Sequence, residues 1–118
     1  MMAKILVVDD AAFMRLRLKS IVEGKGHQVD EAEDGQSALE KIQKDEYDLI
    51  FLDITMPRMD GLTALKAILK ETPDAKVVMC TAMGQQSIIL EAIQAGAKDF
   101  IVKPFDPDRV VQALERLL

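Results

Sequence analysis

The run Ile5-Leu6-Val7-Val8-Asp9-Asp10 near the start of the chain decides the fold. Its consecutive apolar, mostly β-branched residues are typical of a strand buried on both faces, as in a parallel sheet. Similar runs recur at Leu49 to Leu52, Val77 to Cys80 and Phe100 to Val102, and the stretch from His27 to Ala32 alternates in polarity as an edge strand does. The sequence therefore predicts five strands.

The segments between these strands carry apolar residues spaced three and four apart, which predicts amphipathic helices. Gly24, Gly26 and Gly96 suit helix C-termini, and Asp34 and Asp106 suit helix N-caps. Five strands alternating with five helices indicate a doubly wound α/β fold, in which right-handed crossovers cover both faces of a parallel sheet. Ligands of such folds bind at the carboxyl ends of the strands, beside the point where strand order reverses.

Composition narrows the possible functions. The 118 residues suffice for one domain, expected over residues 1–118, and the net charge of -5 argues against a broad nucleic-acid contact. No apolar stretch approaches the ~20 residues of a membrane span, and the N-terminal apolar run is too short for a signal peptide. We therefore expect a cytoplasmic protein without membrane insertion. The lone Cys80 lies among apolar residues and is expected to be a buried thiol.

Polar residues stand at the ends of the predicted central strands: Asp9 and Asp10, then Asp53, then Thr81, then Lys103. Any one of them could be an ordinary solvated loop residue, because strands must end near water. Five such residues reach the same edge of a parallel sheet, and this convergence favours one functional site.

Three carboxylates at neighbouring strand ends repel one another, which raises at least one pKa unless a cation lies between them. Mg²⁺ suits the place, because it prefers oxygen ligands and takes one or two protein carboxylates together with water and phosphate. Asp10 and Asp53 could bind it directly, with Asp9 acting through water. An aspartate can also attack phosphorus, with Lys103 offering a point charge and Thr81 a hydroxyl to the phosphoryl oxygens.

Four motifs, in this order and spacing, resemble those of response-regulator receiver domains. They are Val7-Val8-Asp9-Asp10, the segment from Asp53 to Gly61, Thr81-Ala82-Met83 and Lys103-Pro104-Phe105. The resemblance covers the whole chain and implies a flavodoxin-like sheet of strand order 2-1-3-4-5. Further stretches resemble the stand-alone CheY-type chemotaxis regulators in particular, among them Asp9 to Arg15 and Ala95 to Phe105.

The resemblance assigns a role to each residue at the strand ends. It makes Asp53 the phosphoacceptor, Asp9 and Asp10 an acidic metal pair for Mg²⁺, Thr81 a switch hydroxyl and Lys103 the conserved-type lysine of the family.

Three further expectations rest on the same resemblance. The main-chain carbonyl of Thr55 would be another metal ligand. Phe100 would be an aromatic switch whose ring follows phosphorylation, although it could equally be plain core. The Lys103-Pro104 peptide bond would be cis, against the general preference of proline for trans.

The implied function is that of a phosphoacceptor in a two-component system, with only self-phosphorylation and self-dephosphorylation chemistry of its own. A histidine kinase would be the phosphodonor, and a phosphatase and a flagellar motor switch protein are possible partners of a monomeric chain. Residues 84–95 and 105–117, with the last strand between them, would form the switching surface. A phosphorelay receiver, a receiver from a transcriptional regulator or a phosphorylation-independent interaction module are the alternatives.

Two other protein classes share parts of this pattern. Haloacid dehalogenase phosphatases place an Asp-x-Asp nucleophile after the first strand, whereas this chain has Asp9-Asp10-Ala11 there and its candidate nucleophile follows the third strand. Flavodoxins need a hydroxyl- and glycine-rich phosphate loop at the position of Asp9 and Asp10, whose charges repel phosphate.

Overall fold

The computed structural model describes residues 2–54, 56, 59–82 and 86–118 and contains a parallel sheet of the predicted order, β2-β1-β3-β4-β5. Asp53 and Thr81 are the last residues of their strands rather than the first residues beyond them, so two predicted boundaries were one residue short. The strands are β1 (Lys4–Val8), β2 (Gln28–Ala32), β3 (Leu49–Asp53), β4 (Val77–Thr81) and β5 (Asp99–Val102).

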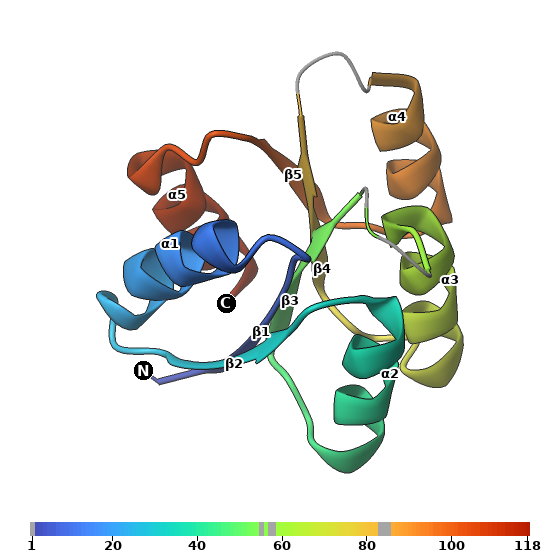
Figure 1. The fold of residues 1–118 in the computed structure, drawn as a ribbon, viewed down its shortest axis with the longest axis horizontal. Coiled ribbons are helices and arrows are strands. Elements are labelled where there is room, and N and C mark those ends of the chain that lie inside the picture. Colours follow the sequence, from blue (N-terminus) through green and yellow to red (C-terminus); the bar gives the residue numbers. More distant parts are fainter. Residues whose placement is uncertain (1, 55, 57–58, 83–85) are drawn as a thin grey trace.

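Helices cover both faces of the sheet, as a doubly wound fold requires. Figure 1 shows α1 and α5 on one face and α2, α3 and α4 on the other. None of the helices within the described ranges has the length and apolar character of a membrane-spanning segment. The helices are α1 (Ala12–Glu23), α2 (Gly35–Lys44), α3 (Gly61–Glu71), α4 (Gln86–Ala95) and α5 (Pro107–Leu117).

The predicted capping residues occupy the helix ends. The side chains of Asp34 and Asp106 accept hydrogen bonds from main-chain N–H groups at the starts of α2 and α5, and Asp60, which the sequence analysis did not single out, does the same for α3. Gly26 and Gly96, which follow α1 and α4, have φ values of 88° and 122°. Both adopt backbone conformations that side-chain-bearing residues rarely reach.

The core forms two clusters, one on each face of the sheet, because successive residues of a strand point to opposite faces. In β1, Leu6 and Val8 join the cluster under α2, α3 and α4, whereas Ile5 and Val7 join the cluster under α1 and α5. Cys80 belongs to the second cluster and is buried, as predicted.

Strand order reverses at β1, which pairs with β2 on one side and with β3 on the other. Val8 lies beside Leu52 in this register, so the residues that follow them, Asp9 just beyond β1 and Asp53 at the end of β3, lie next to each other. The polar strand ends therefore meet at the reversal point, where ligands of doubly wound folds bind.

Candidate functional site

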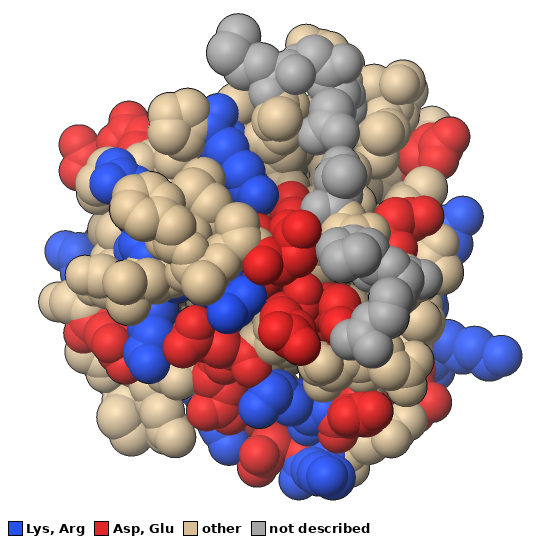
Figure 2. Space-filling view, in the orientation of Figure 1, with Lys and Arg blue, Asp and Glu red and all other residues tan. Residues whose placement is uncertain are grey.

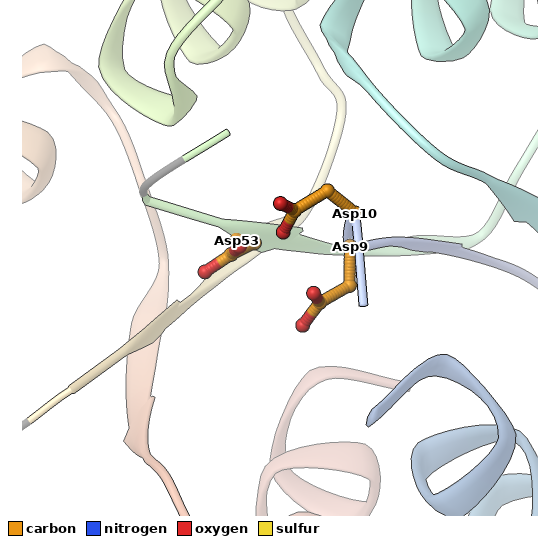
Figure 3. Close-up of side chains that lie close together, drawn as sticks. All are labelled: Asp9, Asp10 and Asp53. Carbon is orange, nitrogen blue, oxygen red and sulfur yellow. The ribbon is translucent and has the colours of Figure 1, made fainter. Parts of the chain in front are cut away.

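Three carboxylates gather at the carboxyl edge of the sheet. Asp9, Asp10 and Asp53 each offer an oxygen atom, and these atoms lie within 4.8 Å of one another. Figure 3 shows the three side chains around a common space, and Figure 2 shows acidic atoms gathered at the middle of this face. Asp9 and Asp53 are buried and Asp10 is exposed, so the cluster opens to solvent on the side of Asp10.

Lys103 joins two of these carboxylates. Its Nζ lies 2.7 Å from Oδ2 of Asp9 and 3.0 Å from Oδ1 of Asp53. The main-chain N–H of Lys103 donates to the carbonyl of Thr81 at 2.7 Å, and the Lys103-Pro104 peptide bond is cis, as the family resemblance implied. The sequence predicts that Lys103 lies near a transferred phosphoryl group. The structure adds that the ammonium group also pairs with the carboxylates of Asp9 and Asp53.

Burial raises the pKa of Asp53 to about 6, and the charges of Asp9 and Asp10 act in the same direction, whereas the hydrogen bond from Lys103 opposes them. Burial alone lowers the pKa of Lys103, but its bonds to Asp9 and Asp53 outweigh burial and hold that pKa above its ordinary value. The predicted mutual repulsion of the carboxylates is thus present, and a single ammonium group compensates for only part of it.

The loop between β1 and α1 is fixed by contacts that the sequence analysis missed. The guanidinium Nη1 of Arg15 donates to the main-chain oxygen of Asp9 at 2.6 Å, and its Nε donates to Oε1 of Glu31 at 3.3 Å. The N–H of Ala11 donates to Oδ1 of Asp9 at 2.9 Å. The signal that could have identified Arg15 is its position in the first turns of the helix that follows the acidic pair.

Thr81 and Phe100 lie on the two strands beyond β3. Thr81 is fully buried, one residue past Cys80, the register partner of Asp53, and its hydroxyl donates to the main-chain oxygen of Ala82 at 3.0 Å. Phe100 is half-buried and packs against the cluster on the side of α4. The predicted ligand Thr55 lies outside the described residues.

The donor set fits a hard divalent cation. All three candidate ligands are carboxylate oxygens, two are buried, and one faces solvent, which leaves room for the waters that Mg²⁺ keeps. Burial is the main cause of the raised pKa of Asp53, and a cation there would reduce the repulsion from Asp9 and Asp10 that adds to it.

Comparisons with known proteins identify the family of the chain. The family model of the response regulator receiver domain matches residues 5–115. The chemotaxis protein CheY of Thermotoga maritima is 53% identical over 115 residues, covering 97% of this chain and 96% of that protein. The CheY of Bacillus subtilis is 55% identical over 116 residues, covering 98% of this chain and 97% of that protein. The solved structure of the chemotaxis protein CheY4 of Vibrio cholerae superposes with a TM-score of 0.93 at 33% identity, covering 100% of both chains.

The strand order, the acidic cluster and these matches define a phospho-accepting receiver of the two-component type, and the chain belongs to the response regulator receiver family. Within that family it is a homologue of the CheY chemotaxis response regulators. This assignment excludes the haloacid dehalogenase and flavodoxin alternatives.

Proposed function

We propose that residues 1–118 form one receiver domain that accepts a phosphoryl group on Asp53 from a histidine kinase. The observation that carries the proposal is the setting of the Asp53 carboxylate. It is buried at the strand-order reversal, 3.0 Å from the Lys103 ammonium group and beside the carboxylates of Asp9 and Asp10. A buried carboxylate beside both a cation and a candidate metal site suits attack on phosphorus better than it suits a structural role.

The transfer balances as a substitution at phosphorus. An oxygen of the Asp53 carboxylate forms the new P–O bond, the P–N bond to the kinase imidazole breaks, and the electron pair returns to the imidazole nitrogen, which then takes up a proton. The Lys103 Nζ lies within hydrogen-bond distance of Asp53, so it can donate to the phosphoryl oxygens once the phosphoryl group is attached to that carboxylate. Attack of water on the phosphorus atom then breaks the P–O bond to Asp53, which releases inorganic phosphate and a proton and returns the carboxylate.

Asp10 and Asp53 are the proposed direct ligands of Mg²⁺, with Asp9 acting through water and the carbonyl of Thr55 as the family-implied fourth contribution. When bound, the cation supplies positive charge to the phosphoryl oxygens during transfer. Asp9 is the least suited to direct ligation, because its oxygens already accept bonds from Lys103 and from the N–H of Ala11.

The proposed output is a change in the surface formed by α4, β5 and α5. Thr81 would move its hydroxyl toward the phosphoryl group, and Phe100 would fill the space that Thr81 leaves. The large apolar side chains of Leu90, Ile93 and Val102 are exposed on α4 and β5, which supports a partner-binding role for this surface.

The proposed setting is chemotaxis in the cytoplasm, with the chain acting as a monomer that docks on a flagellar motor switch protein and is reset by a phosphatase. The similarity to the CheY proteins over nearly the full length of both chains supports this setting over a phosphorelay or a transcriptional regulator.

Intact mass after incubation with acetyl phosphate tests the proposed chemistry. Wild-type protein should gain one phosphoryl group when Mg²⁺ is present and none when it is chelated, and Asp53→Asn should gain none in either case. A gain that persists in Asp53→Asn would place the modification on another residue. No gain in wild-type protein with Mg²⁺ would leave a phosphorylation-independent interaction module.

A further inference from the structure

We infer that Arg15 is a positioning residue for the metal site, acting through the main chain of Asp9 to fix the direction of the Asp10 carboxylate. The inference rests on the proposed function, because it concerns the Mg²⁺ site that phosphoryl transfer requires. Neither the predicted site residues nor their proposed roles include Arg15.

The main chain of Asp9 is held on both sides. Its N–H donates to the carbonyl of Ala32 at 3.1 Å, which continues the pairing of β1 with β2. Its carbonyl oxygen accepts a hydrogen bond from Nη1 of Arg15 at 2.6 Å, and this bond is short and charge-assisted. That carbonyl belongs to the peptide unit that joins Asp9 to Asp10, so the bond fixes the orientation of this unit and the direction in which Asp10 leaves the backbone.

Asp10 depends on this backbone more than the other two carboxylates do. Asp9 is held by Lys103 and by the N–H of Ala11, and Asp53 is held by Lys103 and by its strand. Within the described residues, the Asp10 carboxylate makes no hydrogen bond or ion pair, and the residue is exposed. The position of the proposed direct ligand Asp10 is therefore set by the peptide unit that Arg15 holds.

Arg15 is itself fixed. Its side chain is only 17% exposed, although it extends from a helix beside an open site. Its Nε pairs with Oε1 of Glu31 on β2, and the other carboxylate oxygen of Glu31 accepts Nζ of Lys19 at 3.3 Å. The guanidinium group bonds to Glu31 on β2 through one atom and to the Asp9 carbonyl through another. It therefore connects the edge strand β2 to the loop that carries Asp9 and Asp10.

The positive charge of Arg15 and its proposed orienting role predict opposite changes in metal affinity when Arg15 is replaced. If only its charge mattered, loss of a positive group near three carboxylates would strengthen the binding of a divalent cation. If it orients the Asp10 ligand, its loss weakens metal binding, by about tenfold on the scale of other groups that orient metal ligands. The sign of the change therefore separates a positioning role from simple electrostatics.

Mn²⁺ binding to the whole chain, followed by electron paramagnetic resonance of the free aqua ion and by competition with Mg²⁺, measures this without phosphorylation. We expect Arg15→Met to raise the dissociation constant of both metals about tenfold. Arg15→Lys, which keeps a donor and the charge, should recover part of the loss.

Arg17→Met is the matched control. It removes an equal charge from the same helix, and Arg17 also donates to a main-chain carbonyl, that of Phe105 at 3.1 Å. We expect its metal affinity to equal or exceed that of wild type. Equal or tighter binding by Arg15→Met, or equal weakening by both variants, would overturn the inference while leaving the proposed function intact. Failure of wild-type protein to bind Mn²⁺ would overturn the metal site and the inference together. If Arg15→Met is unfolded by circular dichroism, Arg15→Lys against Arg17→Lys decides the same question.

Discussion

Lys103 Nζ lies 3.0 Å from Oδ1 of Asp53, and the same ammonium group lies 2.7 Å from Oδ2 of Asp9. The carboxylate proposed to accept the phosphoryl group therefore shares its counter-charge with a second carboxylate. Burial outweighs this shared cation and raises the pKa of Asp53 to about 6. Three carboxylates and one ammonium group leave the site with an excess of negative charge, which a divalent cation would reduce.

Replacing Lys103 with methionine should raise the pKa of Asp53 above about 6, because Lys103 is the group that lowers it. The rate of phosphorylation by acetyl phosphate should fall about a hundredfold, the scale for loss of one donor to a developing oxyanion. A carbon-13 titration of the aspartate carboxyl groups and a rate measurement at saturating Mg²⁺ check the two effects. Lys98→Met removes an exposed lysine and should change neither. An unchanged Asp53 pKa in Lys103→Met would contradict the geometry of the pair.

The raised pKa of Asp53 makes the stability of the metal-free protein depend on pH. The folded state binds this proton more tightly than the unfolded state, whose carboxyl has the ordinary value of 3.8. The favourable contribution of Asp53 is therefore fully present below 3.8 and is lost as the pH rises through about 6. Urea denaturation in chelated buffer should show the stability of wild type falling relative to Asp53→Asn across this window.

Mg²⁺ supplies the control for that measurement. At pH values above the Asp53 pKa, added Mg²⁺ should restore stability to wild type, since a ligand that binds only the folded state stabilises it. It should act less on Asp53→Asn, which lacks one proposed ligand. A constant difference between the two proteins over the whole pH range in chelated buffer would mean that the Asp53 carboxyl is not perturbed.

Gly61 allows the first turn of α3 to lie against the acceptor strand. A Cβ atom at this position would overlap the main-chain oxygen of Asp53 and the Cα of Ile54, and the N–H of Gly61 donates to the carbonyl of Ile54 at 2.6 Å. Gly61→Ala must therefore shift either α3 or the end of β3. We expect a loss of about 2 kcal/mol in the free energy of unfolding and slower phosphorylation, because Asp53 itself is displaced.

Gly26→Ala is the comparison for Gly61→Ala. No atom lies within 4 Å of a Cβ built on Gly26, and its cost arises from the φ value of 88°. We expect alanine with this φ value to cost about 1 kcal/mol in the free energy of unfolding. Gly26 follows the C-terminal end of α1, whereas Gly61 lies against the end of β3 that carries Asp53. Urea denaturation and acetyl phosphate kinetics should show a stability loss in both variants but a phosphorylation defect only in Gly61→Ala. Equal kinetics in both would mean that β3 does not yield to the new methyl group.

The fold could be predicted because its determinants are local. Each β-branched run is short, apolar and followed by a segment of helical period, and only a parallel sheet covered on both faces buries such runs completely. The acidic cluster followed from the same logic, since Asp9 and Asp53 leave adjacent strands at the reversal point. The strands β3 and β4 end one residue later than predicted, because the backbone stays extended at Asp53 and at Thr81 although their side chains are polar.

The contacts of the long side chains could not be predicted in this way. Lys103 and Arg15 each reach across the edge of the sheet to groups on other elements, and which oxygen each one meets depends on loop conformation rather than on sequence spacing. The sequence indicated that Lys103 belongs to the site but not that it bridges two carboxylates before phosphorylation. It gave no sign that a main-chain carbonyl, that of Asp9, is the partner of Arg15.

Outside the acidic cluster, the buried carboxylate of Asp99 connects β5 to α5. Its Oδ1 accepts Nη2 of Arg109 at 2.8 Å and its Oδ2 accepts Nη2 of Arg116 at 2.9 Å. Arg109 also donates to the main-chain oxygen of Phe100 at 2.7 Å, so the pairs lie directly beside the proposed aromatic switch. Burial alone raises the pKa of Asp99, but the hydrogen bonds from Arg109 and Arg116 outweigh it and hold that pKa below its ordinary value.

Asp99→Asn should lower the free energy of unfolding at neutral pH by about 1 to 2 kcal/mol, because charge-assisted bonds are lost and both arginines are partly solvated. The lowered pKa means that the contribution of Asp99 is present above the ordinary value of 3.8 and is lost as the pH falls through the folded-state pKa. Urea denaturation at neutral pH and near pH 3 should therefore show the gap between wild type and Asp99→Asn closing in acid. Asp74→Asn, which changes an exposed loop carboxylate, should show little gap at either pH. A gap for Asp99→Asn that stays constant into acid would mean that packing of the side chain, and not its charge, joins α5 to β5.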